Sequence, residues 1–149
     1  MKSLASLEVL SEVRERLRNV RIDDHARWGS MTAKQMVRHL RCSCEVGLGE
    51  RSVEPRQGFA PVLMKFAALR TGIRWPKNLE TVPELKRAIK EHSPSDFDAL
   101  VCAAIDKMQV LAMGTQFAAS HPMFGPMSEE DWKRWGYLHA DHHLRQFGR

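Results

Sequence analysis

Apolar side chains recur at steps of three and four residues in four long stretches of the chain. In the first stretch, from about Leu4 to Val20, Glu, Arg and Ser fill the intervening positions. This alternation is typical of an amphipathic helix that turns one face to the core. The predicted core-facing positions of this helix are Leu7, Leu10, Val13, Leu17 and Val20.

A second helix is predicted from about Ala33 to Val46. Thr32 and Gln35 have the spacing of a capping box, in which each side chain accepts a hydrogen bond from the other residue's backbone amide. Gly47 and Gly49 follow the last apolar position and favour an end to the helix near them.

Two further long helices are predicted in the second half of the chain. The first begins at Ser93 as N-cap, with Pro94 in the first helical position and Asp96 in the first turn. The last begins after Ser128, which precedes three acidic residues, and continues to about Phe147. Helical spacing in the earlier of the two is kept by Phe97, Leu100, Val101, Ile105, Met108 and Leu111.

The segments between these helices are less regular. Residues 51–58 are polar and contain Pro and Gly, whereas residues 59–69 are apolar enough to form a short buried helix. Residues 81–84 have the spacing of a capping box, and residues 85–92 after them favour a loop with a helical turn or two. Residues 121–126 form a turn-rich connector, and no stretch shows a convincing strand pattern. We therefore predict one all-α domain over residues 1–149, a four-helix bundle with a long irregular connection between helices two and three.

Composition restricts the setting and the partners. The longest apolar runs fall far short of the roughly 20 residues that a membrane span requires, and Glu8 interrupts the region where a signal peptide would be apolar. Three cysteines without a disulfide framework agree with a reducing compartment, and we expect a cytoplasmic protein with free, mostly buried thiols. The net charge of +5 is spread among acidic residues, which speaks against a nucleic-acid ligand.

Histidines occupy the core-facing stripe of the last predicted helix. His139 and His143 stand four residues apart, so their side chains point inward from adjacent turns and can converge on one ion. They share the stripe with three other residues, namely Trp132, Gly136 and Gln146. Trp28, Trp75, Trp132 and Trp135 can line a ligand pocket, but Trp132 and Trp135 at helical spacing are first of all core or bundle-rim residues. We give none of the four a catalytic role.

The second helix offers a third histidine on its own inward stripe. His39 lies among apolar neighbours in the middle of that helix and is the natural third ligand. Two substitutes remain open, because His142 can replace His143 and Cys42 can add a thiolate one turn after His39. Solvated or otherwise satisfied histidines would explain the spacing equally well.

Three histidine ligands favour a catalytic rather than a closed structural metal site. They leave positions open for water or substrate, and an ion held in this way can lower a pKa or polarise a substrate. Imidazole suits several divalent ions, with zinc or nickel preferred here and iron or copper as alternatives. Gln146 is the best candidate to orient a ligating imidazole, whereas Asp141 points away from the stripe.

The last helix carries H-x-x-x-H followed by Gln146, and this pattern, with one histidine on the second helix, resembles the DinB/YfiT-like superfamily. Leu144 and Arg145 depart from the Arg-Gly that precedes the glutamine in that superfamily. More specifically, three segments resemble the DUF1569 branch of the superfamily. They are 27–40 with Arg-Trp-Gly-Ser-Met-Thr at its start, 121–127 with His-Pro-Met-Phe-Gly-Pro-Met, and 132–148.

The resemblance implies a DinB-like bundle whose metal triad falls on His39, His139 and His143. It also implies a homodimer and a small-molecule substrate or a low-molecular-weight thiol, since thiol-dependent transferases and isomerases occur in the superfamily. It assigns no reaction, and a non-catalytic binding or stress-response module is the alternative. His121 belongs to the shared pattern and is a further candidate near the metal, although we favour a turn-building role for it.

Overall fold

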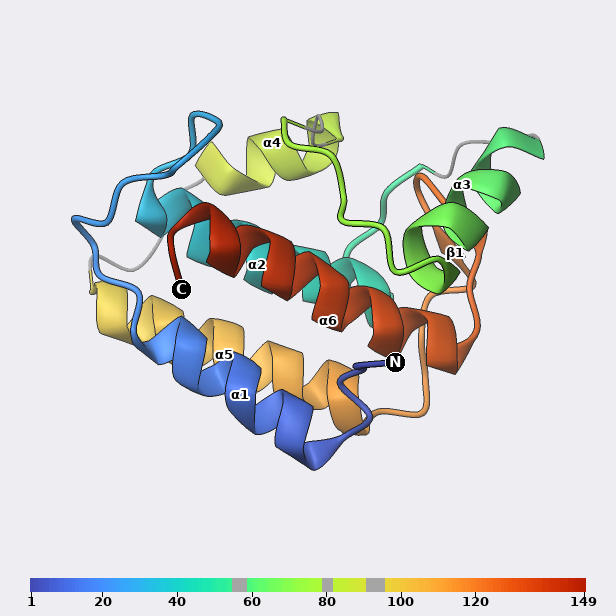
Figure 1. Cartoon of the computed structure of the whole chain (residues 1–149), viewed down its shortest axis with the longest axis horizontal. Helices are drawn as coiled ribbons and strands as arrows, with labels where there is room; N and C mark the ends of the chain where they lie inside the picture. The colour runs from blue at the N-terminus through green and yellow to red at the C-terminus, as the bar shows by residue number, and fades with distance from the viewer. Residues whose placement is uncertain (55–58, 79–81, 91–95) are drawn as a thin grey trace.

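The computed structural model describes residues 1–54, 59–78, 82–90 and 96–149 of the chain. Within these ranges the protein is mostly helical, with six helices and one short two-stranded hairpin (Figure 1). The helices are α1 (Leu7–Arg18), α2 (Ala33–Gly47), α3 (Phe59–Arg70), α4 (Pro83–Lys90), α5 (Phe97–Met113) and α6 (Glu129–Gln146), and the strands are β1 (Ser120–His121) and β2 (Gly125–Pro126).

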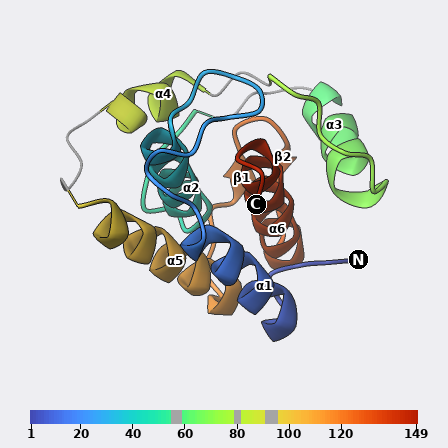
Figure 2. The same ribbon diagram turned by 60° about the vertical axis from the view of Figure 1, so that its left-hand side comes forward.

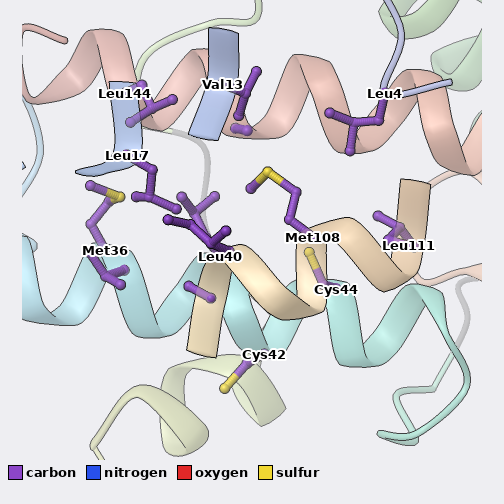
Figure 3. Close-up of a cluster of buried hydrophobic side chains, with 14 of the residues drawn as sticks. Leu4, Val13, Leu17, Met36, Leu40, Cys42, Cys44, Met108, Leu111 and Leu144 are labelled. Carbon is purple, nitrogen blue, oxygen red and sulfur yellow. The ribbon is translucent and has the colours of Figure 1, made fainter. Parts of the chain in front are cut away.

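Four of the helices enclose the apolar core. α1 contacts α5 and α6, and α2 contacts the same two helices from the other side (Figures 1 and 2). Leu17, Leu40, Met108 and Leu144 come one from each helix and are almost fully buried where the four meet (Figure 3). The expectation of an all-α fold therefore holds in its broad form. None of the described helices combines the length and the apolarity of a membrane span.

Local capping signals placed two helix starts correctly. Thr32 is the N-cap of α2 and forms the predicted capping box with Gln35. Ser128 caps α6, and its hydroxyl accepts a hydrogen bond from the backbone amide of Asp131. These contacts satisfy amide groups that a helix start leaves without partners, and they involve only residues three apart, so the sequence alone reveals them.

The start of α5 differs from the prediction. Asp96, not Ser93, is the N-cap, and its carboxylate accepts a hydrogen bond from the backbone amide of Asp98. Residues 93–95, on which the predicted start rested, lie outside the described residues. The helix therefore begins at Phe97, because an aspartate caps a helix as well as a serine does and stands directly before the first buried apolar position.

Leu7 was wrongly assigned to the core stripe of the first helix. It is 76% exposed, because α1 begins only at this residue, after the N-cap Ser6. Leu4, which precedes the helix, is buried instead, and its backbone amide donates to the carbonyl of Lys133 on α6. The chain thus turns its apolar side chain inward before the helical periodicity starts.

α3 forms as predicted but is not buried. Its apolar residues surround the whole helix, and Leu63 and Phe66 are exposed while Leu69 is fully buried. The helix lies at the edge of the molecule beside the hairpin and α6 (Figure 2). Ion pairs from Lys65 and Arg70 to Asp131 tie it to α6. Charge pairing therefore positions α3 together with the burial of Leu69, whereas we expected apolar burial alone.

The connectors behave nearly as expected. α4 is a helix of about two turns, which agrees with the predicted loop containing a helical turn or two. The turn-rich connector before α6 contains an unpredicted hairpin, in which Ser120 pairs with Pro126 and His121 with Gly125. Two-residue strands are too short to show an alternating pattern, so no pattern in the chain predicts them.

Two of the leucines on α1, Leu7 and Leu17, provide a direct test of this packing. We expect Leu17→Ala to lower the free energy of unfolding by about 2–5 kcal/mol, because the side chain is fully buried and its removal leaves a cavity. Leu7→Ala, on the same helix, should change it by less than about 0.5 kcal/mol. Urea unfolding followed by far-ultraviolet circular dichroism measures both. Equal losses would show that α1 packs through a different face.

Candidate metal centre

Three histidines from two helices meet at one point of the interior. One ring nitrogen from each of His39, His139 and His143 lies within 4.8 Å of the other two. The Nε2 atoms of His39 and His139 are 3.0 Å apart. Two nitrogens bound to one zinc ion in tetrahedral geometry lie roughly 3.3 Å apart, so this spacing fits a shared ion. Within the described ranges, no other group of His, Cys, Asp or Glu meets the same condition.

The three histidines converge because each lies on the inward face of its helix, as the spacing predicted. His139 and His143 lie one turn apart on α6, with ring centroids 4.8 Å apart. α6 contacts α2, and the ring of His39 lies 4.8 Å from that of His139 and 4.7 Å from that of His143. The three candidate ligands selected from the sequence are thus brought together, across 100 residues of chain between His39 and His139.

Burial keeps all three imidazoles in the neutral form that can bind a metal. It lowers the pKa of His39 to about 4. Burial, followed by repulsion from the neighbouring imidazoles, lowers the pKa of His139 well below the ordinary value. Burial and His39 do the same for His143, against an opposing effect of its hydrogen bond to Gln146. At neutral pH each ring therefore carries a lone pair on one nitrogen.

Gln146 sets which nitrogen of His143 carries that lone pair. The Gln146 amide nitrogen donates to the backbone carbonyl of Trp28 over 2.7 Å, and a carbonyl can only accept. The amide oxygen of Gln146 therefore faces His143 Nδ1, at 2.8 Å, and must accept a hydrogen bond from it. His143 Nε2 is left free of hydrogen and available as a ligand atom, the usual arrangement for a metal-binding histidine.

Gly29 permits this contact. Its φ of +77° lies in the left-handed region, and a Cβ at this position would come within 2.8 Å of the Gln146 amide nitrogen. Sequence reasoning selected Gln146 but missed the Trp28 carbonyl, because a backbone acceptor leaves no signal in residue type. The Trp-Gly pair at 28 and 29 is the part of the resemblance pattern in which that acceptor lies.

The two substitutes that the sequence left open lie outside the group of three. His142 Nδ1 is buried without a hydrogen-bond partner in the described part of the chain, and its ring is 5.8 Å from that of Trp28. Cys42 is a buried free thiol on the side of α2 opposite Leu40 (Figure 3), and burial raises its pKa. Asp141 pairs with Arg16 and Arg145, as its place off the stripe suggested.

His121 takes part in a turn. Its Nδ1 accepts a hydrogen bond from the backbone amide of Met123 over 3.0 Å, and its ring stacks on Phe124. Burial lowers its pKa to about 3, so the ring is neutral. His121 is absent from the group of three but lines the same cavity, which leaves a contact with a ligand open to test.

Aromatic rings surround the histidines. Trp135 stacks on His139, with centroids 4.8 Å apart and planes 13° from parallel. Trp75 lies on the connection between α3 and α4, and its ring is 6.2 Å from His139 and 6.1 Å from Phe124. The indole of Trp75 is held in place by a hydrogen bond from its Nε1 to the Ala68 carbonyl. These rings lower the local polarity and strengthen electrostatic interactions at the cluster.

A cavity of about 760 Å³ opens beside the cluster, and all three histidines line it. Trp28, Trp75 and Trp135 also line it, whereas Trp132 is fully buried in the core. The assignment of Trp132 and Trp135 to the core is therefore confirmed, and Trp135 lines the cavity as well, as Trp28 and Trp75 do. Their positions depend on segments far apart in the sequence, which helical spacing does not reveal.

Two buried polar atoms on α2 border this site without a partner in the described residues. They are Nδ1 of His39 and the hydroxyl of Ser43, one turn apart on the inward stripe. Both residues line the cavity. An unsatisfied buried polar atom carries an energetic cost and is found mainly where a ligand, an ion or ordered water completes the site.

Comparison with known proteins identifies the family. The family model described as "Protein of unknown function (DUF1569)" matches residues 1–149 of the chain. No curated protein and no solved structure matches it. Because the family model spans every residue of the sequence, the chain belongs to the DUF1569 family.

Proposed function

We propose that this protein is a DinB-like metalloenzyme in which His39, His139 and His143 hold one divalent ion and a small molecule reacts with a low-molecular-weight thiol or with water. The observation that carries the proposal is the convergence of three neutral imidazoles, two buried and that of His139 half-buried, on the wall of a cavity. The packing of α1, α2, α5 and α6 supports the DinB-like four-helix bundle.

The residues present fit such an ion. Three nitrogen donors with no acidic ligand suit zinc or nickel best, with iron or copper as alternatives. The ion would supply Lewis acidity, stabilising the anionic form of a thiol or water and polarising a substrate. The chain itself orients His143 through Gln146, keeps the donor nitrogens unprotonated, and excludes bulk water with Trp75 and Trp135.

The cavity is the part of the site that favours an enzyme acting on small molecules. Its volume of about 760 Å³ is within the range of small-molecule sites. Three histidines leave coordination positions for ligands other than the protein, as catalytic sites do. We further propose a cytoplasmic setting, in which free thiols such as Cys42 and Cys44 persist.

One observation favours a second candidate, a dimeric binding or stress-response module without turnover. Leu63 and Phe66 on α3, with Ile73 just after it, are more than 60% exposed and form an apolar surface at the edge of the molecule. Such surfaces often mark protein interfaces. A homodimer is compatible with both candidates, so metal content and not oligomeric state separates them.

Metal analysis is the decisive test of the proposed site. Protein purified without a histidine tag should contain close to one equivalent of a divalent metal by elemental mass spectrometry. The double variant His139→Ala, His143→Ala should lose it, because a single histidine cannot hold the ion. His25→Ala is the matched control, since His25 is exposed and outside the cluster, and it should keep the metal. Equal trace metal in all three proteins would leave the binding module as the leading candidate.

Removing the support of His143 should weaken the site without removing a ligand. We expect Gln146→Ala to raise the dissociation constant for zinc about 10- to 100-fold, because His143 loses the acceptor that fixes its orientation. Competition with a chromophoric chelator measures this constant. Gln116→Ala, at an exposed glutamine, should leave the constant unchanged. An unchanged constant in Gln146→Ala would show that Gln146 has no role in metal binding.

The lowered histidine pKa values predict a pH dependence for the metal-free protein. The unfolded chain takes up protons below its ordinary histidine pKa of about 6.5, whereas the folded chain resists them. Stability should be fully present above pH 6.5 and fall toward pH 4, near the pKa of His39, by up to about 1.4 kcal/mol per pH unit for each histidine. Urea unfolding of chelator-treated protein at several pH values measures the slope. His39→Leu should make the dependence of stability on pH less steep, whereas His25→Ala should leave it unchanged. A wild-type stability that does not vary with pH would contradict the burial of neutral rings.

A further inference from the structure

The cavity beside the histidines carries positive but no negative side chains in the part of its wall that the structure describes. Arg74 and Lys86 line it, from the connection after α3 and from α4. None of the described lining residues is Asp or Glu. A cationic ligand would therefore find no carboxylate among these residues to replace the water it loses on entry, whereas an anionic group would find the guanidinium of Arg74.

Most of the remaining wall is apolar. Trp28, Trp75 and Phe124 present aromatic rings, and Ile73 and Leu85 add aliphatic surface. Such surfaces stabilise a flat or aliphatic body by removing its surface from water. The volume of about 760 Å³ limits that body to a small molecule.

Arg74 is the residue best placed to recognise charge. It is exposed, lies next to Trp75 in the chain, and has no ion-pair partner among the described residues. Other cations on α3 are already engaged, since Lys65 and Arg70 pair with Asp131. A planar guanidinium binds carboxylate and sulfonate groups through paired hydrogen bonds, and the adjacent indole covers the apolar body attached to them.

We propose that the cavity binds a small apolar monoanion, with its apolar body against Trp28 and Trp75 and its anionic group at Arg74. This inference depends on the proposed function in one respect only, namely that the cavity is the substrate site. The recognition itself uses side chains that need no metal ion, so it can be tested with the ion present or removed.

Two fluorescent probes with the same apolar body provide the test. 8-Anilinonaphthalene-1-sulfonate carries one negative charge, and N-phenyl-1-naphthylamine is its neutral counterpart. Titration of the full-length protein, as purified and after chelator treatment, should show one site that prefers the anion about five- to tenfold, as one charged hydrogen-bonding partner supplies. Energy transfer from the cavity tryptophans to the bound probe should accompany binding.

Three variants locate the preference. Arg74→Gln should reduce the ratio of the two affinities to about one. Arg87→Gln, at an exposed arginine on α4 outside the cavity wall, should leave this ratio unchanged. Phe66→Ser should also keep it, because Phe66 belongs to the exposed α3 surface and not to the cavity. Equal affinity for both probes, an unchanged preference in Arg74→Gln, or loss of binding in Phe66→Ser would each overturn the proposal.

The outcomes separate this inference from the proposed function. An Arg74-dependent preference in a protein that contains no metal would support the anion site and remove the metalloenzyme proposal. Near-stoichiometric metal with no anion preference would support the metal site and remove the anion site. Circular dichroism spectra of the Arg74→Gln and wild-type proteins should coincide, because Arg74 is exposed and its loss leaves no buried group unpaired.

Discussion

Placing three imidazoles in one small volume of the interior is the constraint on which this structure depends. Each ring brings polar nitrogens that lose water on burial and need a partner in return. His39 and His139 face each other across 3.0 Å, and His143 reaches Gln146. α2 and α6 must therefore pack in one register, because a shift of either helix would leave these buried nitrogens without partners.

A second set of contacts holds that register from outside the two helices. The side-chain amide nitrogen of Gln146 donates a hydrogen bond to the Trp28 carbonyl. The backbone carbonyl of Gln146 accepts one from the backbone amide of Arg27 over 2.7 Å. The loop before α2 is thereby joined to the end of α6, next to the residues that hold His143. Because Gly29 leaves room for this joint, a loop residue without functional groups has a direct effect on the chemistry of an imidazole.

The groups that line the cavity decide which ligands can reach the histidine cluster. One side presents neutral nitrogens, the walls present indole and aliphatic surface, and Arg74 supplies positive charge. Low polarity around the rings strengthens every electrostatic interaction made there and makes an uncompensated charge costly. The proposed reaction with a thiol or water and the proposed apolar monoanion both follow from this combination. Neither follows from membership of the DUF1569 family, whose description names no activity.

Spacing along the chain was enough to predict the features that depend on neighbours within one or two helical turns. Capping at Thr32 and Ser128 and the choice of His39, His139 and His143 follow from spacing, because helical geometry fixes which side chains share a face. Spacing could not predict which residues at the helix ends are buried, which tryptophans face the cavity or what else lines it. These depend on segments far apart in the chain, whose packing is set by the joint fit of all the helices and not by any local pattern. The exposed Leu7, the Trp28 carbonyl and the position of Arg74 are examples.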